Sequence, residues 1–195
     1  MYIEFLVEEP SAEAALLAVV PRIVGAEIGF SIHPHQGKPD LLGKLPSRLR
    51  GYANWLPADW RIVVLLDRDD DECQALKAQL EQFAAAAGLT TRAAVEAGAQ
   101  FQVLNRLAIE ELETWFFGDC EAIRAAYPRV PKDLARRANY RDPDDIRGGT
   151  WEALERELQR VGYHRGGLAK IAAARDIAAH MQPERNRSRS FLAFR

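Results

Sequence analysis

The sequence predicts an α/β fold: a three-layer sandwich with a mainly parallel sheet and a C-terminal helical extension. Two observations predict it. Short apolar runs alternate with helical patterns over residues 1–127, and this alternation is typical of parallel βαβ units. The run at residues 61–66, RIVVLL, ends in consecutive apolar residues, which indicates a strand buried on both faces.

The amino-terminal half is expected to supply three strands, each followed by a helix. Ser11 can cap the first helix, Glu13 lies in its first turn, and Pro21 is expected to kink or end it. Gly88 is expected to end the third helix. The predicted strands are 2–7, 27–33 and 61–66, and the later helices are 40–55 and 72–87.

The carboxy-terminal half continues the pattern once more and then changes. A short strand at 101–104 and a helix at 109–117 complete an α/β core over residues 1–127. Residues 128–195 are rich in loops, with helices expected at 151–160 and 167–180, and they are predicted to pack on the core as one structural unit. The tail ends in apolar Phe191 and Phe194, which predicts that it docks back onto the protein.

Composition excludes some classes of function. The net charge of -2 and the pI of about 6.1 give no overall field for binding nucleic acid. Residues 160–195, however, hold eight Lys or Arg against Asp176 and Glu184, so a basic end follows an acidic body. Two distant cysteines, no signal peptide and no apolar run of membrane-spanning length together favour a cytoplasmic protein with no membrane partner.

Carboxylates follow three of the predicted strands. Ligands of open α/β sheets gather at the carboxyl ends of the strands, so these groups are expected to converge if the strands are parallel neighbours. The groups are Glu8 and Glu9, then Asp67 and Asp69, then Glu110, Glu111 and Glu113.

Converging carboxylates repel one another unless a cation lies between them, and Mg²⁺ or Mn²⁺ prefers oxygen ligands. The sequence therefore predicts a divalent-metal site. Asp71 and Glu72 have a simpler interpretation, because acids at the start of a helix interact favourably with its dipole. Glu110 can equally be a solvated side chain, and Glu9 is an alternative to Glu8. The predicted ligands are Glu8, Asp67, Asp69, Glu110 and Glu113.

The order of these motifs resembles the Toprim domain of topoisomerases, primases and OLD-type nucleases, a fold of the Rossmann-like kind. Val7-Glu8 after the first strand matches the start of the usual Val-Glu-Gly motif, and Asp67-x-Asp69 follows a later strand. Two positions depart from the pattern. Glu9 replaces the glycine, and Ser11-Ala12-Glu13 replaces the usual Ser/Asp step, which leaves Glu13 as the nearest stand-in for a second acid.

A closer resemblance spans nearly the whole chain. The segments VEEPSAEAAL, HPHQGKPDLL, LLDRDDDEC, IEELETWFFGD, AAYPRVP and PERNRSRSF are similar to a bacterial family of Toprim-like proteins defined as a domain of unknown function. This resemblance implies the effector half of a two-gene system, paired with an ABC-type or OLD-like ATPase and connected with phage defence.

The resemblance also implies a chemistry, the hydrolysis of phosphodiester bonds in DNA or RNA with Mg²⁺ or Mn²⁺. Glu8, Asp67 and Asp69 would then be catalytic ligands, with Glu113 or Glu110 completing the set. Lys170 and Arg175 are candidates to offset charge on the phosphate, although either can be a solvated helix residue.

The arginines of the tail, Arg185, Arg187 and Arg189, are expected either to bind nucleic acid or to bind the protein's own acids. Two other functions remain open from the sequence: a non-catalytic interaction module, and a metal-dependent hydrolase of a small phosphoester or nucleotide.

Overall fold

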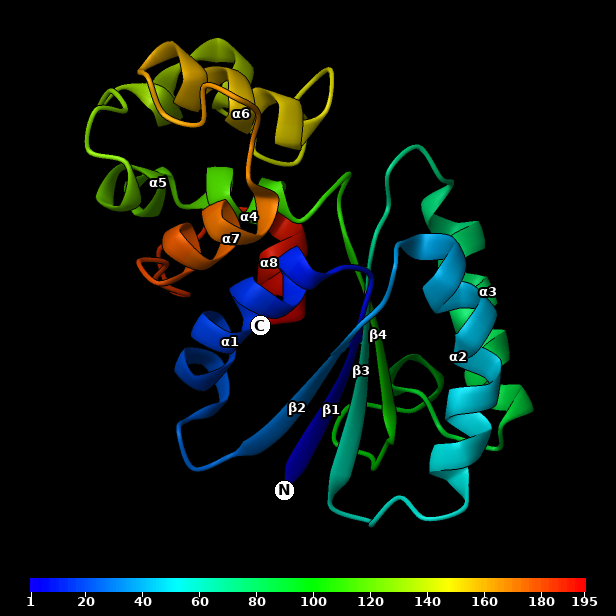
Figure 1. The fold of residues 1–195 in the computed structure, drawn as a ribbon. Helices are drawn as coiled ribbons and strands as arrows, with labels where there is room; N and C mark the ends of the chain where they lie inside the picture. The colour runs from blue at the N-terminus through cyan, green and yellow to red at the C-terminus, as the bar shows by residue number, and fades with distance from the viewer.

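The structure, a computed structural model, describes residues 1–195 and contains one four-stranded parallel sheet. The order in the sheet is β2-β1-β3-β4, with every neighbouring pair parallel. Helices cover both faces of the sheet (Figure 1), so the predicted three-layer α/β sandwich is confirmed. The strands are β1 (Tyr2–Val7), β2 (Gly29–Pro34), β3 (Trp60–Asp67) and β4 (Val103–Ala108).

Each face of the sheet has its own hydrophobic core. Helices α2 (Lys38–Ala53) and α3 (Cys73–Ala86) cover one face and bury the even-numbered residues of β3 from Ile62 to Leu66. Helix α1 (Pro10–Val24) covers the other face, where Val63 and Leu65 point. This alternation follows from the two-residue period of a strand, and it explains why β3 reads as a continuous apolar run.

The second half of the chain builds a helical layer beside the carboxyl ends of the strands (Figure 1). Short 3-10 turns lie at Arg92–Ala94, Leu134–Arg136 and Ala138–Tyr140. The helices of this half are α4 (Glu113–Gly118), α5 (Cys120–Ala126), α6 (Thr150–Arg160), α7 (Lys170–Ala178) and α8 (Arg189–Phe194).

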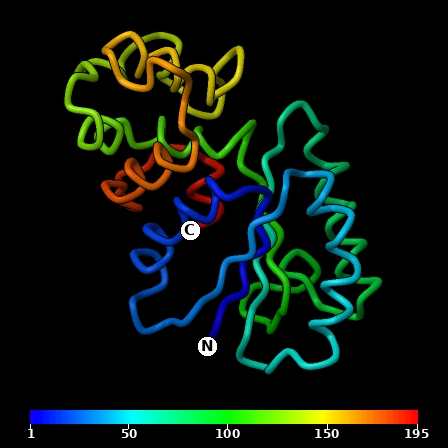
Figure 2. Tube along the Cα trace, in the orientation of Figure 1, coloured from blue at the N-terminus to red at the C-terminus, as the bar shows by residue number.

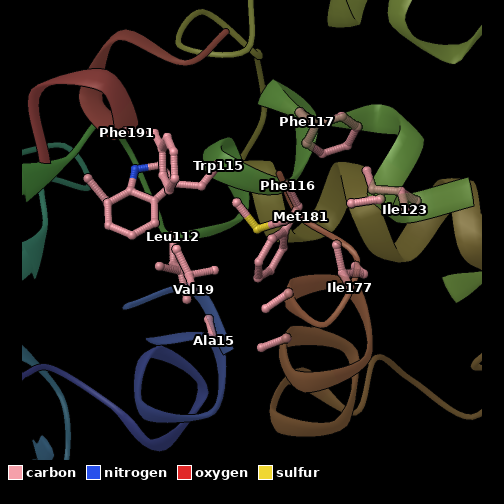
Figure 3. Close-up of a cluster of buried hydrophobic side chains, with 14 of the residues drawn as sticks. Ala15, Val19, Leu112, Trp115, Phe116, Phe117, Ile123, Ile177, Met181 and Phe191 are labelled. Carbon is pink, nitrogen blue, oxygen red and sulfur yellow. The ribbon is translucent and has the colours of Figure 1, made fainter. Parts of the chain in front are cut away.

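The helical layer shares its core with the sheet. Figure 3 shows Ala15 and Val19 of α1 facing Leu112, Ile177 and the aromatic residues of α4. Helix α7 lies along α1, and Arg22 of α1 donates hydrogen bonds of 2.7–2.9 Å to the carbonyl oxygens of Ala178, Ala179 and Met181 at the end of α7. These contacts fix the position of α7, and with it the position of Lys170 at the start of the helix.

The C-terminal tail docks as predicted. The chain returns beside α1 and β4 in its last residues (Figure 2), where Phe191 is fully buried. The rings of Phe191 and Phe194 lie 5.2 and 4.8 Å from that of Trp115, and the Trp115 indole donates a hydrogen bond to Ser190.

Some predicted boundaries were wrong. The last strand begins at Val103 and runs to Ala108 rather than over 101–104, and the following helix begins at Glu113 rather than at residue 109. Pro21 lies inside α1, which continues to Val24. The carbonyl that loses its partner to this proline belongs to Leu17, a residue 56% exposed, so water can replace the missing donor.

No helix has both the length and the apolar character needed to span a membrane.

Candidate active site

Parallel pairing brings the first two carboxylate groups together. Val7 pairs with Leu65, and Asp67 pairs with Ala108, so Glu8 and Asp67 leave adjacent strands at the same level of the sheet. The Glu8 carboxylate accepts a hydrogen bond of 3.2 Å from the backbone N–H of Asp67. Two acids that are far apart in the sequence therefore meet at the carboxyl edge of the sheet.

Glu113 joins them from the start of α4. Its residue is only 1% exposed, and its Oε2 has no hydrogen-bond partner. Burial raises the pKa of Glu113 to about 7, although the nearby Lys170 ammonium lowers it. A buried carboxyl oxygen without a partner is costly, and such a group is a candidate for binding a ligand or a cation.

The pKa values of the other two acids show the same crowding. Burial raises the pKa of Asp67 well above its usual range, and the negative charges of Glu113 and Glu8 raise it further. Burial also raises the pKa of Glu8, and the charge of Asp69 adds to the effect, although the hydrogen bond from Asp67 opposes it. A positive charge between these groups would allow all of them to ionise.

Two residues of the site have a strained backbone. Asp69 has φ 49° and Glu110 has φ 61°, in the left-handed region that non-glycine residues rarely adopt. The two loops are joined there, because the Asp69 N–H donates a hydrogen bond of 2.7 Å to the Glu110 carbonyl oxygen. Strain of this kind is concentrated at functional sites, and here it shapes the loops that carry both carboxylates.

Lys38 is a cation of the site that sequence analysis missed. Its Nζ lies 2.7 Å from Asp69 Oδ2 and 2.6 Å from Asp71 Oδ2, and it donates a hydrogen bond of 3.0 Å to the Arg68 carbonyl oxygen. Burial alone would lower the pKa of Lys38, but the hydrogen bonds to Asp69 and Asp71 outweigh this effect and raise it. Lys38 therefore neutralises part of the charge that follows β3.

The position of Lys38 in the sequence indicates its place in the site. Lys38 is the first residue of α2, shortly after β2, and therefore lies at the same carboxyl edge of the sheet as the acids. The turn that contains Lys38 reads as a polar connection, and the clustering of carboxylates is the only conspicuous sequence feature of this edge.

Lys170 lies on the opposite side of the acids, at the start of α7. Burial alone would lower its pKa, but the charges of Glu113, Glu9 and other acids raise it. The ammonium group also lies 4.8 Å from the centre of the Trp151 ring, a cation–π contact that orients it. The helical layer thus brings a lysine to acids that are distant in the sequence, with Glu113 57 positions away (170 − 113) and Asp67 103 positions away (170 − 67).

The third acidic group divides into residues with different surroundings. Glu111 accepts three hydrogen bonds of 2.9–3.1 Å, from the N–H and hydroxyl of Thr150 and the N–H of Trp151, so it caps the start of α6. Glu110 lies 3.4 Å from Arg68, and burial raises its pKa. A pocket of about 420 Å³ opens beside them, lined by Asp69, Asp70, Glu110, Glu111, Gly148, Gly149 and Glu152.

The chemistry of these side chains fits a hard divalent cation, because Glu8, Asp67 and Glu113 offer carboxylate oxygens and one Glu113 oxygen has no partner. In this structure, no three His, Cys, Asp or Glu side chains are arranged so that together they could bind a metal ion. Binding would therefore require rotation of the carboxylates, including Asp69 away from Lys38.

The other predicted basic residues lie away from the acids. Arg175 is 68% exposed and pairs with Asp176 on the same helix. Arg185 pairs with buried Asp119 at 2.6 Å and with Glu121, and Arg189 pairs with Asp142 and Asp144. The Arg187 side chain is exposed. Two of the three tail arginines thus bind the protein's own acids, which is one of the two alternatives left open by the sequence.

The comparisons with known proteins give one match. Residues 7–195 match the family described as Domain of unknown function (DUF4276). No curated protein and no solved structure matches the chain.

Proposed function

The chain belongs to the DUF4276 family, and we propose that it is a Mg²⁺-dependent nuclease that hydrolyses phosphodiester bonds of DNA or RNA. The observation that carries the proposal is the meeting of Glu8, Asp67 and Glu113, three carboxylates from three elements, in a buried setting between two lysines. Carboxylates that repel one another at the end of a parallel sheet have the arrangement expected of a cation site. The resemblance to Toprim domains supports the same chemistry.

Each residue has a role that its surroundings support. Glu8, Asp67 and Glu113 would hold the cation, with Asp69 and Glu110 at the rim completing the set. When bound, Mg²⁺ would stabilise charge on the phosphate and make a water molecule more acidic.

The two lysines have different roles. Lys170 is held over Trp151 and faces the acids, so its ammonium can offset charge on a phosphate that reaches the site. Lys38 keeps Asp69 at the rim until a cation takes its place.

The test is cleavage of supercoiled plasmid and of single-stranded RNA with Mg²⁺ or Mn²⁺. Asp67→Asn removes the charge of a carboxylate that interacts with both Glu8 and Glu113, so we expect at least about a 100-fold loss of cleavage. Asp133→Asn, at an exposed position beside Arg137, is the matched control and should cleave like the wild type. Full activity in the Asp67→Asn protein would refute the proposal.

A second candidate is a hydrolase of small phosphoesters or nucleotides, and the acidic pocket of about 420 Å³ beside Glu110 and Glu111 favours it. Hydrolysis of free nucleotides without cleavage of either polymer would select it. Mn²⁺ titration separates both enzymes from a non-catalytic module, since a module need not bind Mn²⁺ at these acids.

The partnership with an ATPase in a defence system is part of the proposal and rests on the resemblance alone. Co-expression with a neighbouring ATPase gene and copurification would test it. An active nuclease that copurifies with no ATPase would limit the proposal to the chemistry.

A further inference from the structure

Two arginines lie against one aromatic ring near the amino end of β3, where the chain leads into β4. The guanidinium carbon of Arg61 lies 5.4 Å from the centre of the Phe101 ring, and that of Arg92 lies 5.9 Å from it. We call Arg61, Arg92 and Phe101 the arginine cluster.

Neither arginine forms an ion pair with Asp or Glu. Arg61 donates to the carbonyl oxygens of Ala58 and Trp60 and to Gln100 Oε1. Arg92 donates to the carbonyl oxygens of Val95 and Glu96, at distances of 3.1 and 3.5 Å.

Carbonyl oxygens orient a guanidinium without cancelling its charge. Asp59 is the acid that lies in the same pocket as Arg61, and it is paired at 3.1 Å with the N-terminal ammonium of Met1. The group therefore keeps an excess of positive charge, and such an excess held in place by the backbone indicates an anionic ligand.

A pocket of about 530 Å³ lies at this cluster, with Arg61 and Phe101 in its wall. Ala58, Asp59, Thr90, Gln100 and Gln102 also line it, and Thr90 and the two glutamines supply hydroxyl and amide groups. An aromatic ring beside cations and amides is the combination that binds unpaired bases and their phosphates, because the ring stacks on a base and the cations contact the backbone.

We propose that the arginine cluster binds single-stranded nucleic acid, with a base stacked on Phe101 and phosphates on Arg61 and Arg92. A duplex is excluded as the ligand, since its bases are already stacked and leave no free face for the ring. The binding claim stands independently, and the further claim that the bound strand is the substrate rests on the proposed nuclease function.

The cluster lies toward the far end of the strands from the acids. Arg61 precedes Asp67 by six residues of one strand, a distance of about 20 Å at the usual rise per residue. A strand that reached both sites would have to be several nucleotides long, so longer oligomers should bind more tightly than short ones.

The experiment is fluorescence anisotropy with labelled oligothymidine and oligouridine of about 20 nucleotides, in EDTA so that no metal bridges the acids to phosphate. Arg61→Gln/Arg92→Gln should weaken binding by about tenfold or more and reduce the salt dependence, log K against log salt, by about 1.4. Arg141→Gln/Arg147→Gln removes the same charge from two exposed positions and is the control, with an expected change below about twofold. Phe101→Leu should weaken binding without changing the salt dependence, and circular dichroism would verify that each variant folds.

The outcomes separate this proposal from the nuclease. Absence of binding by the wild type, or equal binding by the Arg61→Gln/Arg92→Gln protein, would overturn it whatever the cleavage assay shows. Equal competition by a duplex or by a free mononucleotide would overturn the choice of ligand. Binding without any cleavage under Mg²⁺ would support the cluster and refute the nuclease.

Discussion

Acidic side chains cluster at one end of the sheet and arginines at the other, and the two groups differ in the partners that surround them. At the carboxyl edge, acids crowd together but Lys38, Arg68 and Lys170 stand among them. Near the amino end of β3, Arg61 and Arg92 donate only to carbonyl and amide oxygens, and the nearby Asp59 is paired with the N-terminal ammonium. The difference shows that the acids form ion pairs with basic side chains of the chain, whereas these two arginines form none with an acid.

This difference separates two kinds of binding. A partly compensated acidic site can exchange an internal lysine for a metal ion, so its affinity for metal depends on the lysine. An uncompensated basic cluster needs no exchange, so its affinity for a polyanion depends mainly on salt.

The largest effect is expected from Glu113→Gln in the metal-free protein. Because the folded-state pKa of about 7 lies above the ordinary value of 4.5, the stabilising contribution of protonated Glu113 is present below about pH 4.5 and is lost as the pH rises through 7. The substitution removes this loss, so it should raise the free energy of unfolding by about 2–3 kcal/mol at pH 8 and by about 1 kcal/mol or less at pH 5. Urea denaturation at both pH values measures it.

The matched control for Glu113 is Glu184→Gln at an exposed position, which should change stability by less than about 0.5 kcal/mol at either pH. A destabilised Glu113→Gln protein at pH 8 would mean that its carboxylate is already satisfied. The cation site would then lose its main support.

The next effect has the opposite sign and concerns Glu111. Its removal in Glu111→Ala takes three hydrogen bonds from the start of α6, so stability should fall by about 1–2 kcal/mol. Because the loss is structural, it should be similar at pH 5 and pH 8, as measured by the same urea denaturation. A pH-dependent gain instead would place Glu111 among the cation ligands.

The sequence predicted much of the acidic edge because one rule governs it. The residue at the end of a buried parallel strand lies at the carboxyl edge of the sheet. Glu8 and Asp67 could therefore be placed together from the sequence. The same rule applies to Lys38, but a lone lysine in a turn has no distinctive neighbours in the sequence. The separate roles of Glu111 and Glu113 were also beyond the sequence, because they depend on where Thr150 and Lys170 arrive.

The arginine cluster could not be predicted, for a related reason. Arg61 comes from a strand and Arg92 from a 3-10 turn, and each lies in an ordinary local context. Only packing around Phe101 reveals that they are neighbours. Among the basic residues that the sequence did single out, Arg185 and Arg189 belong to a conspicuous run, and the fold pairs them with Asp119 and Asp144.

A smaller effect is expected at Lys38. In Lys38→Met, Asp69 and Asp71 lose the ammonium group that lies within 2.7 Å of both. The acids then carry more uncompensated charge and no competitor for a cation, so Mn²⁺ should bind about 3- to 10-fold more tightly by calorimetric titration. Lys38→Arg keeps the charge and should bind Mn²⁺ like the wild type.

The outcome at Lys38 also bears on catalysis. If Mn²⁺ binding weakened in Lys38→Met, the lysine would be organising the ligands rather than competing with the metal. The comparison between the two ends of the sheet would then be wrong at its acidic end.

The smallest effect is expected at the opposite end, on stability. The Arg61→Gln/Arg92→Gln protein loses hydrogen bonds to carbonyl oxygens that water can replace, and relieves repulsion with Arg106. These terms oppose each other, so the free energy of unfolding should change by less than about 0.5 kcal/mol for each residue. Urea denaturation in low and high salt measures this change in the free energy of unfolding. The change should become slightly more destabilising in high salt, because the repulsion between the arginines is already screened there. A large loss of stability would mean that the arginines hold the loop before β4 in place, and their charge would then need no ligand to explain it.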